Sequence, residues 1–180
     1  RTEITVDQFR EFVQSSGYRP TATRRGYSMV YEERSGNFVR RNGIDWQSTY
    51  DGMRAGDDLP VAHVSASDAE AYADWLSRQS GQHYRLPSEA EFEYALRAGG
   101  NGAYPWPGTN PPKGIDNLAG IDASPSGRNW GDAFAGYSDS YWGPDPVAHS
   151  AANTFGRCDM IVHGAEWTQD CWPGGLRSRA

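Results

Sequence analysis

The sequence predicts a loop-rich α+β fold with a few short helices and small sheets. Three segments begin with a capping box, which marks the start of a helix, and two short segments are candidate strands. The 180 residues include 21 glycines and 11 prolines, and these residue types favour turns over long regular elements. We expect residues 1–180 to form a single domain that lacks part of its N- and C-terminal ends.

Each predicted helix has a start signal, apolar residues at helical spacing and a glycine at its end. The capping boxes are residues 5–8, 65–68 and 88–91, and the glycines that follow the helices are Gly17, Gly81 and Gly99. In each box a side-chain oxygen accepts a hydrogen bond from a backbone amide of the first turn, and a second side chain bonds back. The helices span only about two to four turns, so packing must stabilise them.

Two segments are candidate strands. Residues 27–31 alternate weakly between apolar and polar side chains, and residues 61–64 are a second short, mostly apolar run. The three helices are expected to flank a small sheet, with the long loops on one side.

Residues 101–150 contain clusters of Gly, Pro, Asn and Asp and have no clear periodicity. A stretch of this length without secondary structure is uncommon inside a compact domain, yet disordered segments are poor in aromatic residues. This stretch contains Tyr104, Trp106, Trp130, Phe134, Tyr137, Tyr141 and Trp142. We therefore predict a long ordered loop region that is held by buried aromatic rings and by metal ions.

Composition excludes two classes of partner. The formal net charge is −6, and the positive charges are almost all arginine without a basic run, so nucleic acid is not an expected partner. No window approaches the roughly 18 apolar residues of a membrane span. The acidic balance and the Asp and Asn residues in predicted loops suit calcium.

The two cysteines, Cys158 and Cys171, lie thirteen positions apart. This spacing is not that of a metal motif. The pair is compatible with a disulfide or with two buried thiols, and the sequence leaves both alternatives open.

Several blocks, taken in order, match the motifs of one protein family. The longest, residues 85–95, reads Arg-Leu-Pro-Ser-Glu-Ala-Glu-Phe-Glu-Tyr-Ala and differs from the family signature only at Ser88 and Phe92. Further blocks lie at residues 4–18, 60–65, 104–108, 153–160 and 165–170. Together they resemble the formylglycine-generating-enzyme (sulfatase-modifying factor) family over nearly the whole chain.

The resemblance implies a C-type-lectin-like fold and two calcium sites. The first site would use the Asn117 side chain, the Leu118 carbonyl, Asp139 and the Tyr141 carbonyl. The second would use Asp159, the Val162 and Gly164 carbonyls, and Glu166. Such sets of carboxylate, amide and carbonyl oxygens are the hard ligands that calcium requires.

Two observations weigh against these sites. Asn and Asp are also ordinary turn residues whose side chains bond nearby amides, so Asn117, Asp139 and Asp159 have a purely structural interpretation. In the second site, moreover, Val162 stands where the family has a glycine, and a backbone that bends around an ion favours glycine.

The resemblance does not extend to cysteine oxidation. Oxidising members carry two reactive cysteines shortly after an Arg-Gly-Gly-Ser turn near the C-terminus, and neither Cys158 nor Cys171 falls at a matching position. We therefore expect no catalytic residue of that kind. The four histidines also lack the His-x3-His-x-Glu pattern of the related sulfoxide synthases, so they are interpreted as structural or surface residues.

Two functions remain as expectations. The first is a calcium-stabilised module that binds a protein or small-molecule ligand, as in cysteine-free members that serve as sensors or as variable display proteins of diversity-generating retroelements. Trp130, Trp142 and Trp172 are its candidate contact residues, although core packing is the simpler role for each. An extracytoplasmic location is expected, since calcium is abundant there.

The second function is enzymatic. A related periplasmic protein acts on a siderophore-precursor peptide without the cysteine pair, so an oxidoreductase that acts on a peptide is the alternative. Glu166 or Asp170 would be its candidate base.

Overall fold

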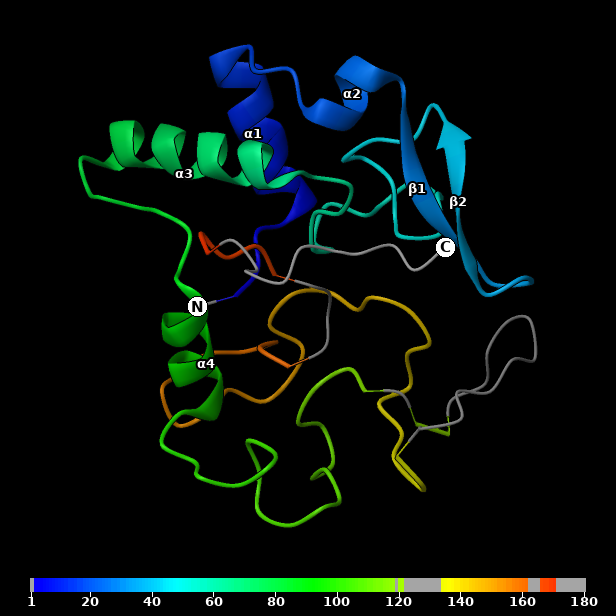
Figure 1. The fold of residues 1–180 in the computed structure, drawn as a ribbon, viewed down its shortest axis with the longest axis vertical. Coiled ribbons are helices and arrows are strands. Elements are labelled where there is room, and N and C mark those ends of the chain that lie inside the picture. The colour runs from blue at the N-terminus through cyan, green and yellow to red at the C-terminus, as the bar shows by residue number, and fades with distance from the viewer. Residues whose placement is uncertain (1, 119, 122–133, 162–165, 171–180) are drawn as a thin grey trace.

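The computed structural model describes residues 2–118, 120–121, 134–161 and 166–170 (Figure 1). Its elements, in chain order, are α1 (Val6–Ser16), α2 (Thr21–Arg25), β1 (Tyr27–Glu32), β2 (Asn37–Asn42), α3 (Ala66–Ser80) and α4 (Glu89–Arg97). The predicted α+β class, with few helices and one small sheet, is confirmed.

All three predicted helices form, and their caps have the expected geometry. At α1 the Thr5 hydroxyl accepts the Gln8 amide at 3.1 Å, and the Gln8 side chain accepts the Thr5 amide at 3.0 Å. The N-caps Ser65 of α3 and Ser88 of α4 form the same reciprocal pair of bonds. Because each box uses residues only three positions apart, the start of a helix is readable from sequence alone.

Helix α4 ends differently from the other two. Its C-cap is Ala98, which has a left-handed conformation with φ 46°, whereas α1 and α3 end on glycines in that conformation. A residue with a Cβ is strained there, by roughly 1–2 kcal/mol. The glycine predicted to end this helix, Gly99, lies one position further on.

We expect Ala98→Gly to raise the free energy of unfolding by about 1 kcal/mol, because glycine relieves the strain at the cap. Urea denaturation measures the change. Ala95→Gly, inside α4, is the matched control and should lower the stability by about 1 kcal/mol. If Ala98→Gly also lowered the stability, the left-handed cap would not limit this helix.

Within the described residues, the sheet is one antiparallel hairpin. Strand β1 pairs with β2 in a register that places Val30 opposite Val39 and Tyr31 opposite Phe38. The predicted strand at residues 27–31 is confirmed, while β2 was not predicted. The reason is that five of its six residues are exposed, so β2 lacks an apolar alternation and follows from its pairing with β1.

The second predicted strand, residues 61–64, is wrong. Only an isolated bridge between Thr5 and Pro60 forms there, together with a hydrogen bond from the Val61 amide to the Ile4 carbonyl. His63 has φ 57°, and a left-handed residue interrupts an extended run.

The expected arrangement of helices around a sheet is also corrected. Helix α1 packs on α3, and the short helix α2, which was not predicted, is the helix beside β1. Figure 1 shows α4 well apart from the hairpin, with the long loops gathered below both. The expected placement of the loops on one side is therefore confirmed.

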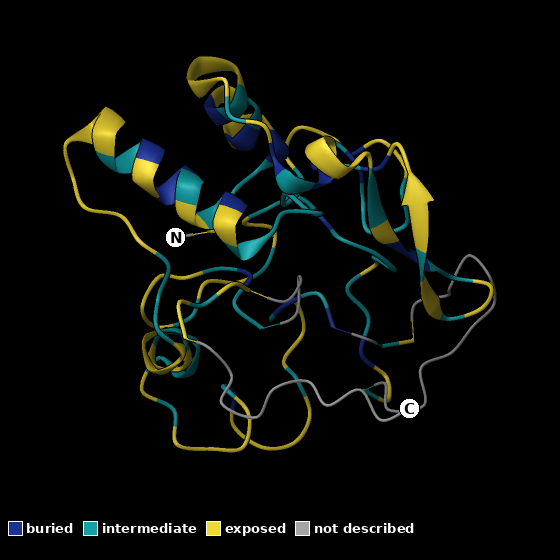
Figure 2. Cartoon of the chain, turned by 45° about the horizontal axis from the view of Figure 1, so that its top comes forward, coloured by how far each residue is buried: buried dark blue, intermediate teal, exposed yellow. Residues whose placement is uncertain are grey.

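Among the described residues, two apolar clusters hold the fold. The first is formed by buried residues of α1, α3 and the segment between β2 and α3, namely Val6, Phe9, Phe12, Trp46, Ala55, Tyr72 and Trp75. Figure 2 shows buried positions alternating with exposed ones along both helices, as expected for amphipathic helices that share a core.

The second cluster lies in the long loops. Trp106, Leu118 and Tyr137 are buried, and Phe134 and Ile161 pack against them. The part of the chain described after α4 contains no helix or strand, and side-chain packing together with hydrogen bonds between the loops orders it. The predicted role of buried aromatic rings is confirmed for Trp106 and Tyr137, while Trp130 lies outside the described residues.

None of the helices in the described ranges combines the length and the hydropathy that crossing a membrane requires.

Candidate functional site

The structure brings the predicted first calcium site together around one carboxylate. Oδ2 of Asp139 accepts a hydrogen bond from the Leu118 amide at 2.9 Å, and Oδ1 accepts one from the Tyr141 amide at 2.9 Å. Asp139 therefore joins two segments that are about 20 residues apart in sequence. A carboxylate oxygen is also a hard ligand of the kind that calcium binds.

Asn117 attaches to the same loop through its side-chain nitrogen. Nδ2 donates to the Gly143 carbonyl at 2.7 Å and to Oδ1 of Asp145 at 3.1 Å. All four predicted ligands thus lie in two segments that are bonded to each other, residues 117–118 and 139–145.

These residues fit a calcium ion by their chemistry. One carboxylate, one amide and two backbone carbonyls offer hard oxygen ligands. Asp116, Asp145 and Asp159 are buried in the same loops, at 2%, 1% and 4% exposure, and each accepts hydrogen bonds there.

The fit is not that of a carboxylate-rich centre. Over the ranges the structure describes, no group of three or more His, Cys, Asp or Glu residues is arranged to hold a metal, and the predicted site needs only one carboxylate. The observed bonds of Asp139 are also those that the turn interpretation expects, and calcium removal distinguishes the two.

The second predicted site is only partly described. Asp159 is buried, and its carboxylate accepts the amides of Ala148 and Ser150. Glu166 is exposed and lines a different cavity from Asp159. The other two predicted ligands, Val162 and Gly164, lie outside the described residues, so this site stays a prediction.

A cleft of about 680 Å³ opens between α3, residues 60–64 and Trp167. We call it the Trp167 cleft. Its apolar walls include Val61, Val64, Tyr72 and Leu76, and its polar lining includes His63, Arg85 and Glu166. An apolar concave surface with a few polar groups is the usual form of a ligand site.

Trp167 is held at this cleft by a side-chain hydrogen bond. Its Nε1 donates to the Val64 carbonyl at 3.0 Å, and the residue is 47% exposed. Sequence reasoning did not select it, although it follows Glu166 in a recognised block. Trp142, which was selected, is half-buried and donates to Glu33 at 2.6 Å, while Trp130 and Trp172 lie outside the described residues.

His63 has a structural role in the wall of the cleft. One ring nitrogen contacts the Thr49 carbonyl at 2.8 Å and the other contacts the Ser28 hydroxyl at 2.9 Å. Since a carbonyl only accepts, Nε2 donates to Thr49, and Nδ1 is hydrogen-bonded to the Ser28 hydroxyl. For His63 the interpretation of a lone histidine as a satisfied structural residue is confirmed.

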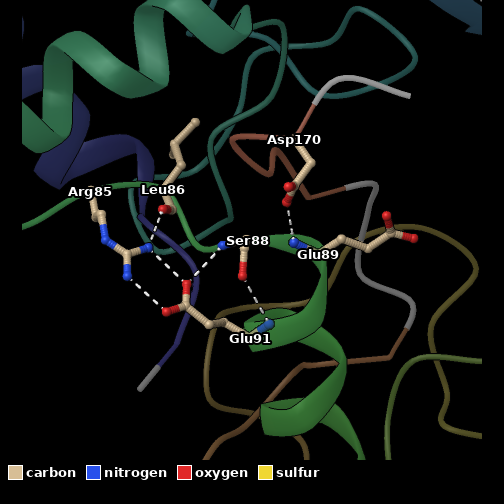
Figure 3. A network of polar contacts seen from close by, with 6 residues as sticks. All are labelled: Arg85, Leu86, Ser88, Glu89, Glu91 and Asp170. Atoms are coloured by element: carbon tan, nitrogen blue, oxygen red, sulfur yellow. Dashed lines mark hydrogen bonds and ion pairs between the residues drawn. The ribbon is translucent and has the colours of Figure 1, made fainter. Parts of the chain in front are cut away.

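The signature block forms a polar network at the start of α4 (Figure 3). Both carboxylate oxygens of Glu91 accept from the Arg85 guanidinium at 2.7 Å, and one also accepts the Ser88 amide at 2.8 Å. The Arg85 guanidinium, followed by the Ser88 amide, lowers the pKa of Glu91 to about 2. These bonds fix the turn into α4, so the signature block has a structural role.

Asp170 belongs to the same network. Its Oδ2 accepts the Glu89 amide at 2.5 Å, as Figure 3 shows. A carboxylate at a helix N-terminus stabilises the helix, so this bond gives Asp170 a structural role. Of the two candidate bases, only Glu166 lines the Trp167 cleft.

The described cysteine does not have the surroundings of a reactive thiol. Cys158 is a half-buried free thiol, and burial, followed by the negative charge of Asp159, raises its pKa. Reactive cysteines have the opposite shift. Cys158 is absent from the lining of the Trp167 cleft, and Cys171 lies outside the described residues.

Known proteins resemble this chain over most of its length. A formylglycine-generating enzyme from Bos taurus is 30% identical over 94% of this chain and 47% of its own length. An "Inactive C-alpha-formylglycine-generating enzyme 2" from Mus musculus is 31% identical over 98% of this chain and 59% of its own length. The chain thus spans about half the length of these curated relatives.

Among solved structures, PvdO from Pseudomonas aeruginosa superimposes with a TM-score of 0.60 and 26% identity, covering 95% of this chain and 55% of that one. Residues 1–177 match the family described as "Sulfatase-modifying factor enzyme 1-like domain". The ordered motifs, the α+β fold and these similarities agree, and the chain belongs to the formylglycine-generating-enzyme (sulfatase-modifying factor) family.

Proposed function

We propose that this domain is a calcium-stabilised binding module that holds a protein or small-molecule ligand in the Trp167 cleft and does not oxidise cysteine. The observation that carries the proposal is the cleft itself, in which an exposed indole stands beside apolar walls. A sensor role or a variable display role would both use such a surface, and an extracytoplasmic location would supply the calcium.

The proposed stabilisation by calcium rests on the contacts of Asp139. An ion that binds only the folded protein stabilises it by mass action, by about 2.7 kcal/mol at one hundred times its Kd. For a chain of this size that corresponds to a rise in melting temperature of about 5–10 °C.

We therefore expect that removing calcium with EGTA, at constant magnesium, lowers the melting temperature by about 5–10 °C. Calorimetry measures the change. In Asp139→Asn most of the calcium-dependent rise in melting temperature should be lost, because this change removes the one charged side chain among the predicted ligands. Asp74→Asn, at an exposed position of α3, is the matched control and should keep that rise. An unchanged melting curve in EGTA would refute calcium stabilisation.

The cleft part predicts binding of an apolar probe. We expect 8-anilinonaphthalene-1-sulfonate to bind the native protein and Trp167→Ala to weaken that binding by about tenfold, since the indole supplies a large contact area. Fluorescence titration gives both affinities, and Phe38→Ala tests another exposed aromatic residue that lines the same cleft. Equal affinities for wild type and Trp167→Ala would show that Trp167 does not contribute to binding of the probe.

The alternative is an oxidoreductase that acts on a peptide. It is favoured by the position of Glu166, a carboxylate that lines the cleft beside Trp167. Oxygen uptake by the metal-supplemented protein in the presence of a cysteine-containing peptide, lost in Glu166→Gln, would support this alternative and refute the binding module.

A further inference from the structure

We propose that Asp145 is a positioning residue for calcium: it fixes the side-chain amide of Asn117 so that the amide oxygen, and not the nitrogen, is available to the ion. This inference rests on the proposed calcium site. Its basis is the pair of hydrogen bonds from Nδ2 of Asn117 to the Gly143 carbonyl and to Oδ1 of Asp145, at 2.7 and 3.1 Å.

The two partners determine which way the amide points. A carbonyl oxygen and an ionised carboxylate oxygen can only accept hydrogen bonds. A flipped amide would place its own oxygen against both of them and would lose both bonds. The observed orientation is therefore set by the network, and it turns Oδ1 away from Gly143 and Asp145. Only that oxygen is a ligand that calcium accepts.

The positions of the two acceptors are themselves fixed by packing. Asp145 is 1% exposed. At Gly143 a Cβ would lie 3.0 Å from the Tyr50 ring, and the Tyr50 hydroxyl donates to Glu33 at 2.9 Å. Tyr50 thus packs against the loop that orients Asn117. Such supporting contacts commonly change metal affinity by about 10–100-fold when removed.

The test is a double-mutant cycle on the full chain, with the calcium Kd measured by calorimetric titration. Asp145→Ala should weaken calcium binding by about 10–100-fold. Asp145→Asn keeps an acceptor oxygen for Nδ2 and should retain an affinity within about threefold of wild type. In an Asn117→Ala background, Asp145→Ala should have no further effect, because the residue acts through the Asn117 amide.

The outcomes separate this inference from the proposed function. Wild type that binds no calcium would refute the calcium site and the inference with it. Wild type that binds calcium while Asp145→Ala weakens binding equally in both backgrounds would refute only the inference, because Asp145 would then act by its charge or its own ligation. If Asp145→Asn weakened calcium binding as much as Asp145→Ala, the positioning role of Asp145 would likewise be refuted.

A measurement on the wild-type protein covers the case in which Asp145→Ala does not fold. The inference predicts that both side-chain NH protons of Asn117 exchange slowly with solvent, with and without calcium, whereas those of the exposed Asn101 exchange fast. Nuclear magnetic resonance of the side-chain amides gives both rates. Equal exchange at the two residues would overturn the proposed orientation.

Discussion

Replacing Asp68 with alanine is expected to lower the free energy of unfolding by about 3–5 kcal/mol. Asp68 is fully buried, at 0% exposure. Its carboxylate accepts hydrogen bonds from the Tyr18 hydroxyl at 2.9 Å, from the Thr21 amide at 3.0 Å and from both the amide and the hydroxyl of Ser65 at 2.8 Å. The end of α1, the start of α2 and the cap of α3 therefore meet at one side chain.

The cost arises from the donors left behind. Each buried donor that loses its partner costs about 1–3 kcal/mol, and alanine leaves several. Chemical denaturation measures the loss, and Asp74→Ala, on an exposed position of the same helix, should change the stability by less than about 0.5 kcal/mol. A similarly small effect for Asp68→Ala would mean that water replaces the carboxylate without cost.

Asp68 also predicts a pH dependence. Burial raises its pKa, but the hydrogen bonds from Ser65, Tyr18 and Thr21 outweigh burial and hold the pKa below 3.8. Because the pKa is lower in the folded protein than in the unfolded chain, this contribution is fully present above pH 4 or so and is lost as the pH falls through the folded-state pKa. Asp68→Asn should therefore flatten the acid side of the stability curve.

The second large effect is expected at the centre of the helical core. Phe12→Ala should lower the free energy of unfolding by about 3–5 kcal/mol, because it leaves a cavity that the surrounding rings cannot fill. Phe12 is 1% exposed, and its ring lies 5.3 Å from Phe9, 5.6 Å from Tyr72 and 5.5 Å from Trp75 between centroids.

Phe12→Leu and Phe38→Ala are the matched controls for this prediction. Leucine keeps most of the volume and should cost clearly less than alanine. Phe38 is 67% exposed, so its removal should change the stability by less than about 0.5 kcal/mol. Denaturant midpoints give the comparison, and equal losses at Phe12 and Phe38 would show that the core does not depend on the Phe12 ring.

The core matters to function because the Trp167 cleft is built on it. Phe9 and Tyr72 belong to the first apolar cluster and also line the cleft. A ligand in the cleft would therefore contact side chains that are held by the same packing as α1 and α3. Core variants should be compared for probe binding only under conditions where they are fully folded.

The sequence alone determined the features that depend on neighbouring residues. Capping boxes at Thr5, Ser65 and Ser88 located three helices, since each box closes over three positions. The ordered motifs identified the family. The prediction of a strand at residues 61–64 was wrong, however, because the apolar pattern does not reveal the left-handed backbone of His63.

Only the tertiary structure decided which distant residues meet. Strand β2 exists because β1 pairs with it. Trp167 lines the cleft because it bonds to Val64, 103 positions away, and Asp139 joins Leu118 to Tyr141. Contacts over such separations depend on loop closure and on the packing of the whole chain. Local patterns therefore specified the elements and the family, whereas long-range packing specified the site.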